Sequence, residues 1–184
     1  MQQQPSVIQT GDFLYFAPTG QAYTVPAAGT VSSTSKPGAG DAIWTTFALG
    51  TVKKPTQDKV EAKAVAIKAP IPGTGIVTTM NIVRPQRDMK MMVEMNELSR
   101  LSLAGFYQCP LIQLTDTSFN PLSGSGSFQG WLKRQRYDAT NGLYIVDDWY
   151  VDLSVTDMPT DEENLLRPKF EFNWLYSPLA ASAI

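Results

Sequence analysis

One continuous stretch, residues 89–107, changes its hydrophobic period halfway along, and this change restricts the fold more than any other feature. Met89, Met91, Val93 and Met95 alternate with mostly polar residues, which is the two-residue period of a half-buried β-strand. From Leu98 onward, apolar and small residues recur at the spacing of one helix face. The stretch therefore predicts one strand that runs directly into one short α-helix, at about residues 97–107.

The sequence also predicts where that helix starts and ends. Asn96 is suited to be the N-cap, because its side-chain oxygen can accept hydrogen bonds from the free N–H groups of the first turn. Glu97 then places a negative charge at the positive end of the helix dipole. Pro110 cannot continue a helix, so we expect the helix to end near Cys109.

The other periodic segments predict strands, and 184 residues suit a single domain with one sizeable core. Residues 84–88 predict a turn, and Asn-Gly at 141–142 suits the turn of a late hairpin. The alanines and lysines of 60–69 would also suit a helix, but the alternation there favours a strand. We expect a mainly β, antiparallel β-sandwich or barrel with one flanking helix. The expected strands are 12–17, 41–49, 60–69, 76–83, 89–95, 111–114, 128–137, 143–156 and 169–176.

Residue types restrict the chemistry strongly. The chain has no histidine and one cysteine, so it offers no His-activated nucleophile, no thiolate zinc cluster and no internal disulfide. Asp157 and the acidic run at 161–163 could gather calcium, but a solvated loop is the favoured interpretation. No apolar run approaches a membrane span, and the first residues do not form a signal peptide. We expect no enzyme activity, no cofactor and no metal.

A basic cluster at 133–136 lies beside Trp131, and basic residues among aromatics can bind single-stranded nucleic acid. The partner strand of the predicted hairpin carries Asp147, Asp148 and Asp152. Opposite charges facing each other across a hairpin stabilise it, so ion pairs within the chain are the favoured interpretation.

Three groups of residues, in order along most of the chain, resemble a known family. The first is Leu-Tyr-Phe-Ala-Pro-Thr-Gly at 14–20, followed by Trp44 and Leu-Gly-Thr-Val at 49–52. The second is the strand that runs into Asn-Glu-Leu at 96–98 and a short helix. The third is the late hairpin with the aromatic strand Phe-Glu-Phe-Asn-Trp-Leu at 170–175. Together they resemble the major tail tube proteins of long-tailed, non-contractile bacteriophages.

This resemblance implies a virion structural protein that forms rings of six copies, and the rings would stack into a hollow tail tube. The tube would conduct the DNA genome without sequence-specific binding. The implied protein partners are further copies of the chain and the tape measure, tail terminator and distal tail proteins, with no membrane. The implied location is the virion tail, assembled in the cytoplasm of the host bacterium.

The same resemblance implies two kinds of site residue. An acidic or neutral lumen would let DNA slide, since fixed cations would hold phosphate. The candidates for that wall are Asp148, Asp152 and Asp157. The N-terminal arm 1–11 and the long loop 18–40 are poor in apolar residues, and a C-terminal tail covers 177–184. We expect arm and loop to be mobile in a free subunit and to order against neighbours. The candidate contacts are Val7, Ile8, Tyr23, Val25 and Val31.

Two other functions stay open on sequence alone. A carbohydrate-binding or adhesive β-sandwich would use exposed aromatics such as Trp131, Trp149 or Tyr150. The second possible function is that of another virion part, such as a head decoration or tail terminator protein. Size in solution separates them, because a tube protein forms rings or long polymers and a sugar-binding module stays small.

Overall fold

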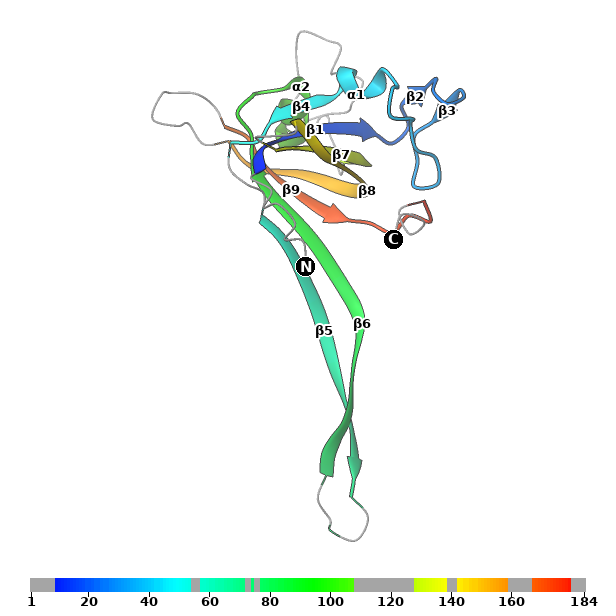
Figure 1. Ribbon diagram of the computed structural model, residues 1–184, viewed down its shortest axis with the longest axis vertical. Helices are drawn as coiled ribbons and strands as arrows, with labels where there is room; N and C mark the ends of the chain where they lie inside the picture. Colours follow the sequence, from blue (N-terminus) through cyan, green and yellow to red (C-terminus); the bar gives the residue numbers. More distant parts are fainter. Residues whose placement is uncertain are drawn as a thin grey trace, which may run out of the picture.

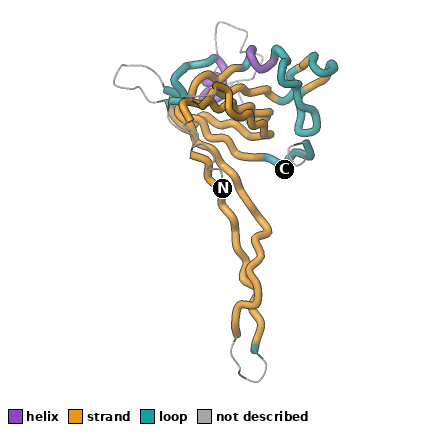
Figure 2. Tube along the Cα trace, viewed as in Figure 1, coloured by secondary structure: helices purple, strands orange, loops and turns teal. Residues whose placement is uncertain are grey.

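The computed structural model describes residues 9–53, 57–71, 74, 77–107, 128–138, 142–158 and 167–179. Strands dominate these residues, and two helices accompany them, as Figures 1 and 2 show. The mainly β prediction is therefore confirmed. The elements are β1 (Gln9–Pro18), β2 (Ala22–Tyr23), β3 (Gly29–Thr30), α1 (Ile43–Thr46), β4 (Ala48–Thr51), β5 (Gln57–Pro70), β6 (Val77–Glu94), α2 (Arg100–Tyr107), β7 (Phe128–Asp138), β8 (Gly142–Asp157) and β9 (Lys169–Trp174).

Seven strands form one antiparallel sheet in the order β4-β1-β7-β8-β9-β6-β5, and β2 pairs with β3 in a small second sheet. The sheet is not closed, because β4 and β5 stand at its two edges. The expected late hairpin is present as β7 and β8, and Gly142 has the positive φ of 73° that its turn position requires.

Apolar side chains fill both faces of this sheet, because successive residues of a strand point to opposite sides. Leu14, Phe16 and Leu132 belong to a larger core that includes Leu101 and Ala104 of α2. On the other face, Trp131 and Tyr150 lie in a second core with Ile43 and Trp44 of α1 and with Ala17 and Val31. The body is thus a sheet covered by α2 on one face and by the segment around α1 on the other.

The strand expected at 41–49 is wrong, because its first half forms α1. Asp41 Oδ1 accepts the backbone N–H of Ile43 at 2.9 Å, which supports a helical turn at that point. One turn also lets the consecutive side chains of Ile43 and Trp44 both be buried, which a strand would not allow on one face. Trp44 Nε1 donates to the Gly38 carbonyl at 2.8 Å and fixes the ring.

The turn expected at 84–88 is wrong as well, because β6 continues through it without a break. The two separate strands expected at 76–83 and 89–95 are one strand of 18 residues. The register with β5 shifts where Pro85 lies, between the pairs Lys63↔Gln86 and Val65↔Val83. A bulge tolerates a proline, since the missing N–H costs no ladder hydrogen bond there. The strand expected at 60–69 is confirmed as part of β5.

The helix begins at Arg100 and not at Glu97, so Asn96 is not its N-cap. Ser99 takes that role: its hydroxyl accepts the backbone N–H of Ser102 at 3.1 Å, and Ser102 Oγ accepts the N–H of Ser99 at 3.2 Å. This reciprocal pair has the arrangement of a capping box. Asn96 instead joins neighbouring segments, since its amide donates to Thr51 Oγ1 at 3.2 Å and its carbonyl accepts from Arg167 at 2.7 Å.

We predict that Ser99→Ala lowers the free energy of unfolding by roughly 0.5–2 kcal/mol, the usual cost of removing an N-cap. Thermal unfolding of the variant and the wild type measures this. Asn96→Ala is the matched comparison, and we expect it to cost less, because its side-chain contacts are exposed. A larger loss for Asn96→Ala than for Ser99→Ala would contradict the assignment.

Candidate functional site

The most distinctive feature of the molecule is a two-stranded arm, formed by β5 and β6, that extends far beyond the body (Figure 1). β9 pairs with β6 only from Lys90 to Glu94, so β5 is the one described strand that pairs with residues 77–89 of β6. At about 3.3 Å per residue, this unsupported part is about 40 Å long. Among the described strands, β5 pairs with β6 alone, so none of them covers its outer backbone edge.

The arm exposes large apolar side chains. Half of the large hydrophobic residues exposed in the described part of the chain lie on β5, on β6 or at the arm's tip. Those on the distal part are 40–61% exposed. An isolated two-stranded hairpin is only marginally stable in water, and an open, apolar edge favours pairing with another chain. The exposed residues are Val60, Val65, Ile67, Ile71, Val77, Ile82 and Met92.

The root of the arm is anchored firmly in the body. Met91, Val93 and Met95 of β6 and its continuation point into the larger core and are at most 5% exposed. Surface ion pairs join the same region to its neighbours: Lys90 Nζ lies 3.1 Å from Glu171 Oε1 of β9, and Lys53 Nζ lies 3.0 Å from Glu94 Oε1. The arm is therefore a continuation of the core sheet and not a separate flexible loop.

A buried charge cluster lies beside this root. Arg134 of β7 is 1% exposed, and its guanidinium lies 3.6 Å from Asp147 Oδ2 of β8 and 3.2 Å from Met91 Sδ of β6. Arg136 approaches the same carboxylate oxygen at 2.6 Å. The Trp149 ring lies 5.5 Å from the Arg134 guanidinium. These contacts confirm the predicted pairing across the hairpin for Arg134 and Arg136, which share Asp147. Asp148 pairs instead with Lys36 of the loop at 18–40.

The loop at 18–40 is packed against its own chain, which corrects the expectation that it lacks internal partners. Trp131 Nε1 donates to the Ser32 carbonyl at 2.8 Å, and Ser177 Oγ donates to that of Ser33 at 2.6 Å. Lys133, which is 5% exposed, donates to the Ala39 carbonyl at 3.0 Å and lies 4.4 Å from the Trp44 ring. Burial lowers the pKa of the Lys133 ammonium.

Asp41 closes this loop at its far end. Its Oδ2 accepts the backbone N–H groups of Thr24 and Val25, each at 2.7 Å, while Oδ1 accepts that of Ile43. The bond from Ile43 is the largest cause that lowers the carboxyl pKa below its ordinary value of 3.8, with the bonds from Thr24 and Val25 adding to it. Sequence reasoning did not predict that Asp41 accepts backbone hydrogen bonds from the loop. Its position before a segment that contains a tryptophan does not indicate this role.

We predict a pH dependence of unfolding that is carried by Asp41. A carboxyl with a lowered folded-state pKa stabilises the fold above its ordinary value of 3.8, and this contribution is lost as the pH falls through the folded-state pKa. Asp41→Asn should lower the melting temperature at pH 7 and flatten its fall between about pH 4 and pH 2. Melting curves across this range measure both effects. An identical acid slope in the two proteins would contradict the prediction.

The three acidic lumen candidates do not form a free acidic surface. Asp148 Oδ2 pairs with Lys36 Nζ at 3.1 Å, and Asp157 Oδ2 lies 3.6 Å from Lys169 Nζ. Asp152 is half-buried within β8. Asp157 is the most accessible of the three, with 58% of its side chain exposed. Their place in a lumen stays a prediction.

The candidate contacts between subunits separate into three groups. Val7 and Ile8 lie outside the described residues. Val31 is 1% exposed in the second core and Tyr23 packs against it, so Val31 is not available to a neighbouring copy and that expectation is wrong. Tyr23 also bonds to Ser35 Oγ at 2.6 Å. Of the three described candidates, Val25 is the most exposed, at 43%.

The aromatic platform needed for sugar binding is absent at the expected positions. Trp131 and Tyr150 are at most 5% exposed and pack edge to face, 5.7 Å apart. Trp149 is half-buried against Trp174. Among the described residues, no group of His, Cys, Asp and Glu could hold a metal ion, and no helix is long and apolar enough to cross a membrane. Cys109 and residues 161–163 lie outside the described ranges.

The chain was compared with known proteins, and the result leaves the arm of β5 and β6 as the main evidence on function. No protein-family model matches the chain, and a search of curated proteins finds none similar to it. Sequence reasoning missed the arm because it placed a turn in the middle of β6. The Pro-Ile-Pro-Gly run at 70–73 is the signal that could have predicted the arm. It separates two long segments in which apolar and polar residues alternate, and Pro85 is the one other turn signal in them.

Proposed function

We propose that this protein is a self-assembling virion structural protein, the subunit of rings that stack into a hollow phage tail tube. The observation that carries the proposal is the arm of β5 and β6, which projects beyond the body. A body with its own two cores extends a two-stranded sheet of about 40 Å into solvent, with an open edge and exposed β-branched residues. Such a structure is stabilised when another protein surface covers it.

The position of the arm favours assembly into stacks. It leaves the body at one end of the long axis, as Figure 1 shows, so an arm that contacts the body of another copy joins two unlike surfaces. Contacts between unlike surfaces form rings when the rotation closes and open stacks when it does not. Both are needed for a tube of stacked rings. The ring of six copies and the DNA-conducting role are proposed from the sequence resemblance.

Electron microscopy and sedimentation of the concentrated full chain test this proposal. Rings of uniform diameter, or tubes built from them, are the expected result. A chain that sediments as a monomer at every concentration and forms no rings or tubes would overturn it.

A further inference from the structure

The charges of the arm change with distance from the body. Its end, residues 69–83, contains no charged residue. The segments directly behind this end, 62–68 and 84–87, contain two lysines and two arginines and no Asp or Glu, which gives them a charge of +4. These four cations, the cation belt, are Lys63, Lys68, Arg84 and Arg87. Nearer the root both signs occur, since Lys59 pairs with Glu61.

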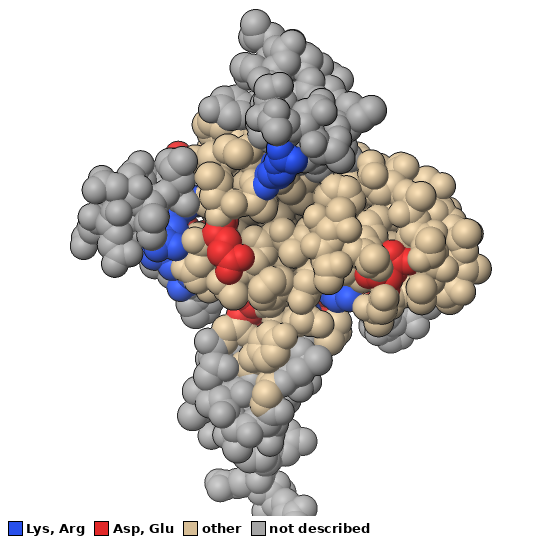
Figure 3. Space-filling model, turned by 90° about the horizontal axis from the view of Figure 1, so that it is seen from above, with Lys and Arg blue, Asp and Glu red and all other residues tan. Residues whose placement is uncertain are grey.

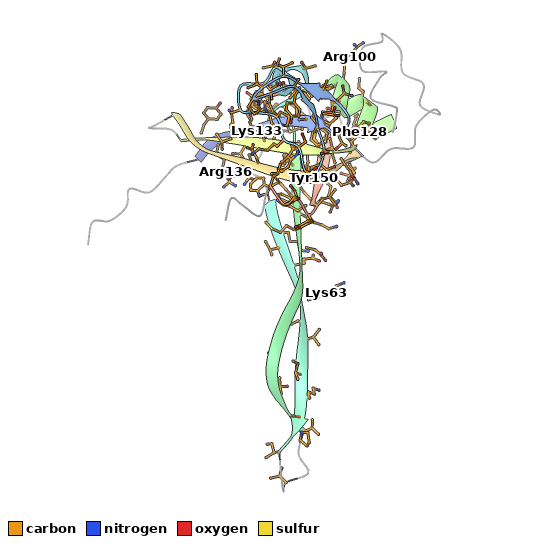
Figure 4. All side chains as sticks on the ribbon, turned by 90° about the vertical axis from the view of Figure 1, so that its right-hand side faces the viewer. Lys63, Arg100, Phe128, Lys133, Arg136 and Tyr150 are labelled. Carbon is orange, nitrogen blue, oxygen red and sulfur yellow. The ribbon has the colours of Figure 1, made fainter. Side chains whose placement is uncertain are left out.

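The described lysines of the cation belt are open to solvent. Lys63 and Lys68 are exposed, and Figure 4 shows Lys63 partway along the arm, away from the side chains of the body. On the end of the body opposite the arm, by contrast, cations and anions both occur at scattered positions (Figure 3). The belt is therefore a local concentration of positive charge directly behind an uncharged end.

Apolar side chains are exposed on both faces of this hairpin. Val65 and Ile67 lie on one face, because they are two residues apart on β5. Ile82 lies on the other face, because it pairs with Ala66 and directly opposite residues of an antiparallel pair share a face. These three apolar side chains are 49–54% exposed. One flat protein surface covers a single face of such a ribbon, whereas the apolar layer of a bilayer surrounds both.

The length of the uncharged end fits the surface of a bilayer and not a crossing of it. Lys68 and Ile71 are about 10 Å apart along the chain, at about 3.3 Å per residue. Elements that lie in a membrane interface bury their apolar groups to a depth of about 5–10 Å. A two-stranded hairpin keeps unpaired backbone N–H and C=O groups at its edges, so it cannot by itself cross the hydrocarbon layer.

We propose that the uncharged end of the arm enters the surface of a bilayer that contains anionic phospholipids, while the cation belt binds their phosphate groups. Basic residues near an anionic surface strengthen binding, and the long lysine stems let the ammonium groups stay among the headgroups while neighbouring apolar residues go deeper. An uncharged end disfavours nucleic acid as the partner, because phosphate binding there would need cations. The inference goes beyond the proposed function and applies to a subunit whose arm no other copy covers.

Vesicle flotation of the full chain, at a concentration below that of assembly, tests the role of the cation belt. We expect binding to vesicles of equal parts phosphatidylcholine and phosphatidylglycerol to be at least about tenfold tighter than to phosphatidylcholine alone. Lys63→Gln with Lys68→Gln should weaken binding to the mixed vesicles at least about tenfold. Lys63→Arg with Lys68→Arg is the matched control and should bind like the wild type. Equal binding to both kinds of vesicle, or binding to neither, would overturn the inference.

The role of the apolar end is tested separately. Ile71→Thr with Val77→Thr should weaken binding to the mixed vesicles at least about tenfold, whereas Val146→Thr, at 44% exposed on β8, is the matched control and should not. In a Cys109→Ser background, an environment-sensitive fluorophore on Ile71→Cys should shift its emission to the blue on these vesicles. The same fluorophore on Lys59→Cys, behind the belt, should not shift. A shift at both positions or at neither would overturn the proposed placement.

Vesicle binding and assembly are measured independently, so their failures are distinguishable. A chain that forms rings or tubes and whose free subunit binds no mixed vesicles would refute only this inference. A chain that binds them through its arm and never assembles would support this inference and refute the proposed function. Binding to duplex DNA that depends on Lys63 and Lys68, without binding to vesicles, would identify nucleic acid as the partner and overturn the inference.

Discussion

Shortening the arm should produce a folded monomer that cannot assemble. In the register of the hairpin, Lys63 faces Gln86, so residues 64–85 can be replaced by Asn-Gly, the preferred two-residue hairpin turn. None of the residues described within 64–85 belongs to either core, and Met91, Val93 and Met95 stay in place. We expect a melting temperature close to that of the wild type, with no rings or tubes in sedimentation or microscopy.

A second variant separates the length of the arm from its chemistry. Val65→Thr, Ile67→Thr and Ile82→Thr together keep the β-branched shape and the strand propensity but remove apolar surface. We expect assembly to weaken strongly. Val146→Thr on β8, a residue of similar exposure at 44%, is the matched control and should assemble normally. Normal tubes from the shortened chain would refute the role of the arm in assembly, and unfolding of its body would refute the expectation that the body folds without the arm.

Local elements of the fold could be predicted from the sequence where the hydrophobic pattern matches the way the side chains pack. The two-residue period of 89–95 correctly predicts a strand that enters the core, because Met91, Val93 and Met95 point inward. The late hairpin follows from alternating residues on both sides of Asn141-Gly142. The ion pair between Arg134 and Asp147 follows from opposite charges at facing positions, and Arg136 reaches the same carboxylate from a diagonal position.

The arm could not be predicted by the same reasoning, because hydrophobic periodicity assumes that the apolar face meets a core in the same chain. Val65, Ile67 and Ile82 alternate as core residues do and yet are exposed. A proline inside β6 also suggested a turn, whereas the strand absorbs it at a shift of register. The misplaced N-cap has a similar origin, since Asn96 and Ser99 are both suitable caps and tertiary contacts with Thr51 and Arg167 occupy Asn96.

The loop was misjudged for a different reason. Its composition is poor in apolar residues, and this favours disorder only if polar groups find no fixed partners. Here, side chains distant in the sequence supply them: Trp131 and Lys133 donate to its carbonyls, and Asp41 accepts its N–H groups. Donors and acceptors brought together by the fold leave no periodic trace in a sequence.

The second large effect should come from Asp147, whose carboxylate is the counter-charge of two arginines. Asp147→Asn keeps the size of the side chain but leaves Arg134, at 1% exposed, beside a neutral group. Breaking a buried ion pair from one side typically costs about 3–5 kcal/mol, because the charge that stays buried loses its counter-charge. For a domain of this size, that corresponds to a melting temperature lower by about 10 °C. Thermal unfolding of variant and wild type measures it.

Two comparison variants show whether charge burial is the cause. Glu171→Gln removes a surface ion pair of similar length, with Lys90 at 3.1 Å, and should cost less than about 1 kcal/mol. Arg134→Met combined with Asp147→Leu removes the buried cation as well as its partner, while Arg136 is partly exposed and can be hydrated. We expect this double variant to be more stable than Asp147→Asn alone, since apolar groups often replace a buried ion pair without loss. If the double variant were the less stable of the two, shape and not charge would hold this part of the sheet together, and the cluster beside the root of the arm would be ordinary packing.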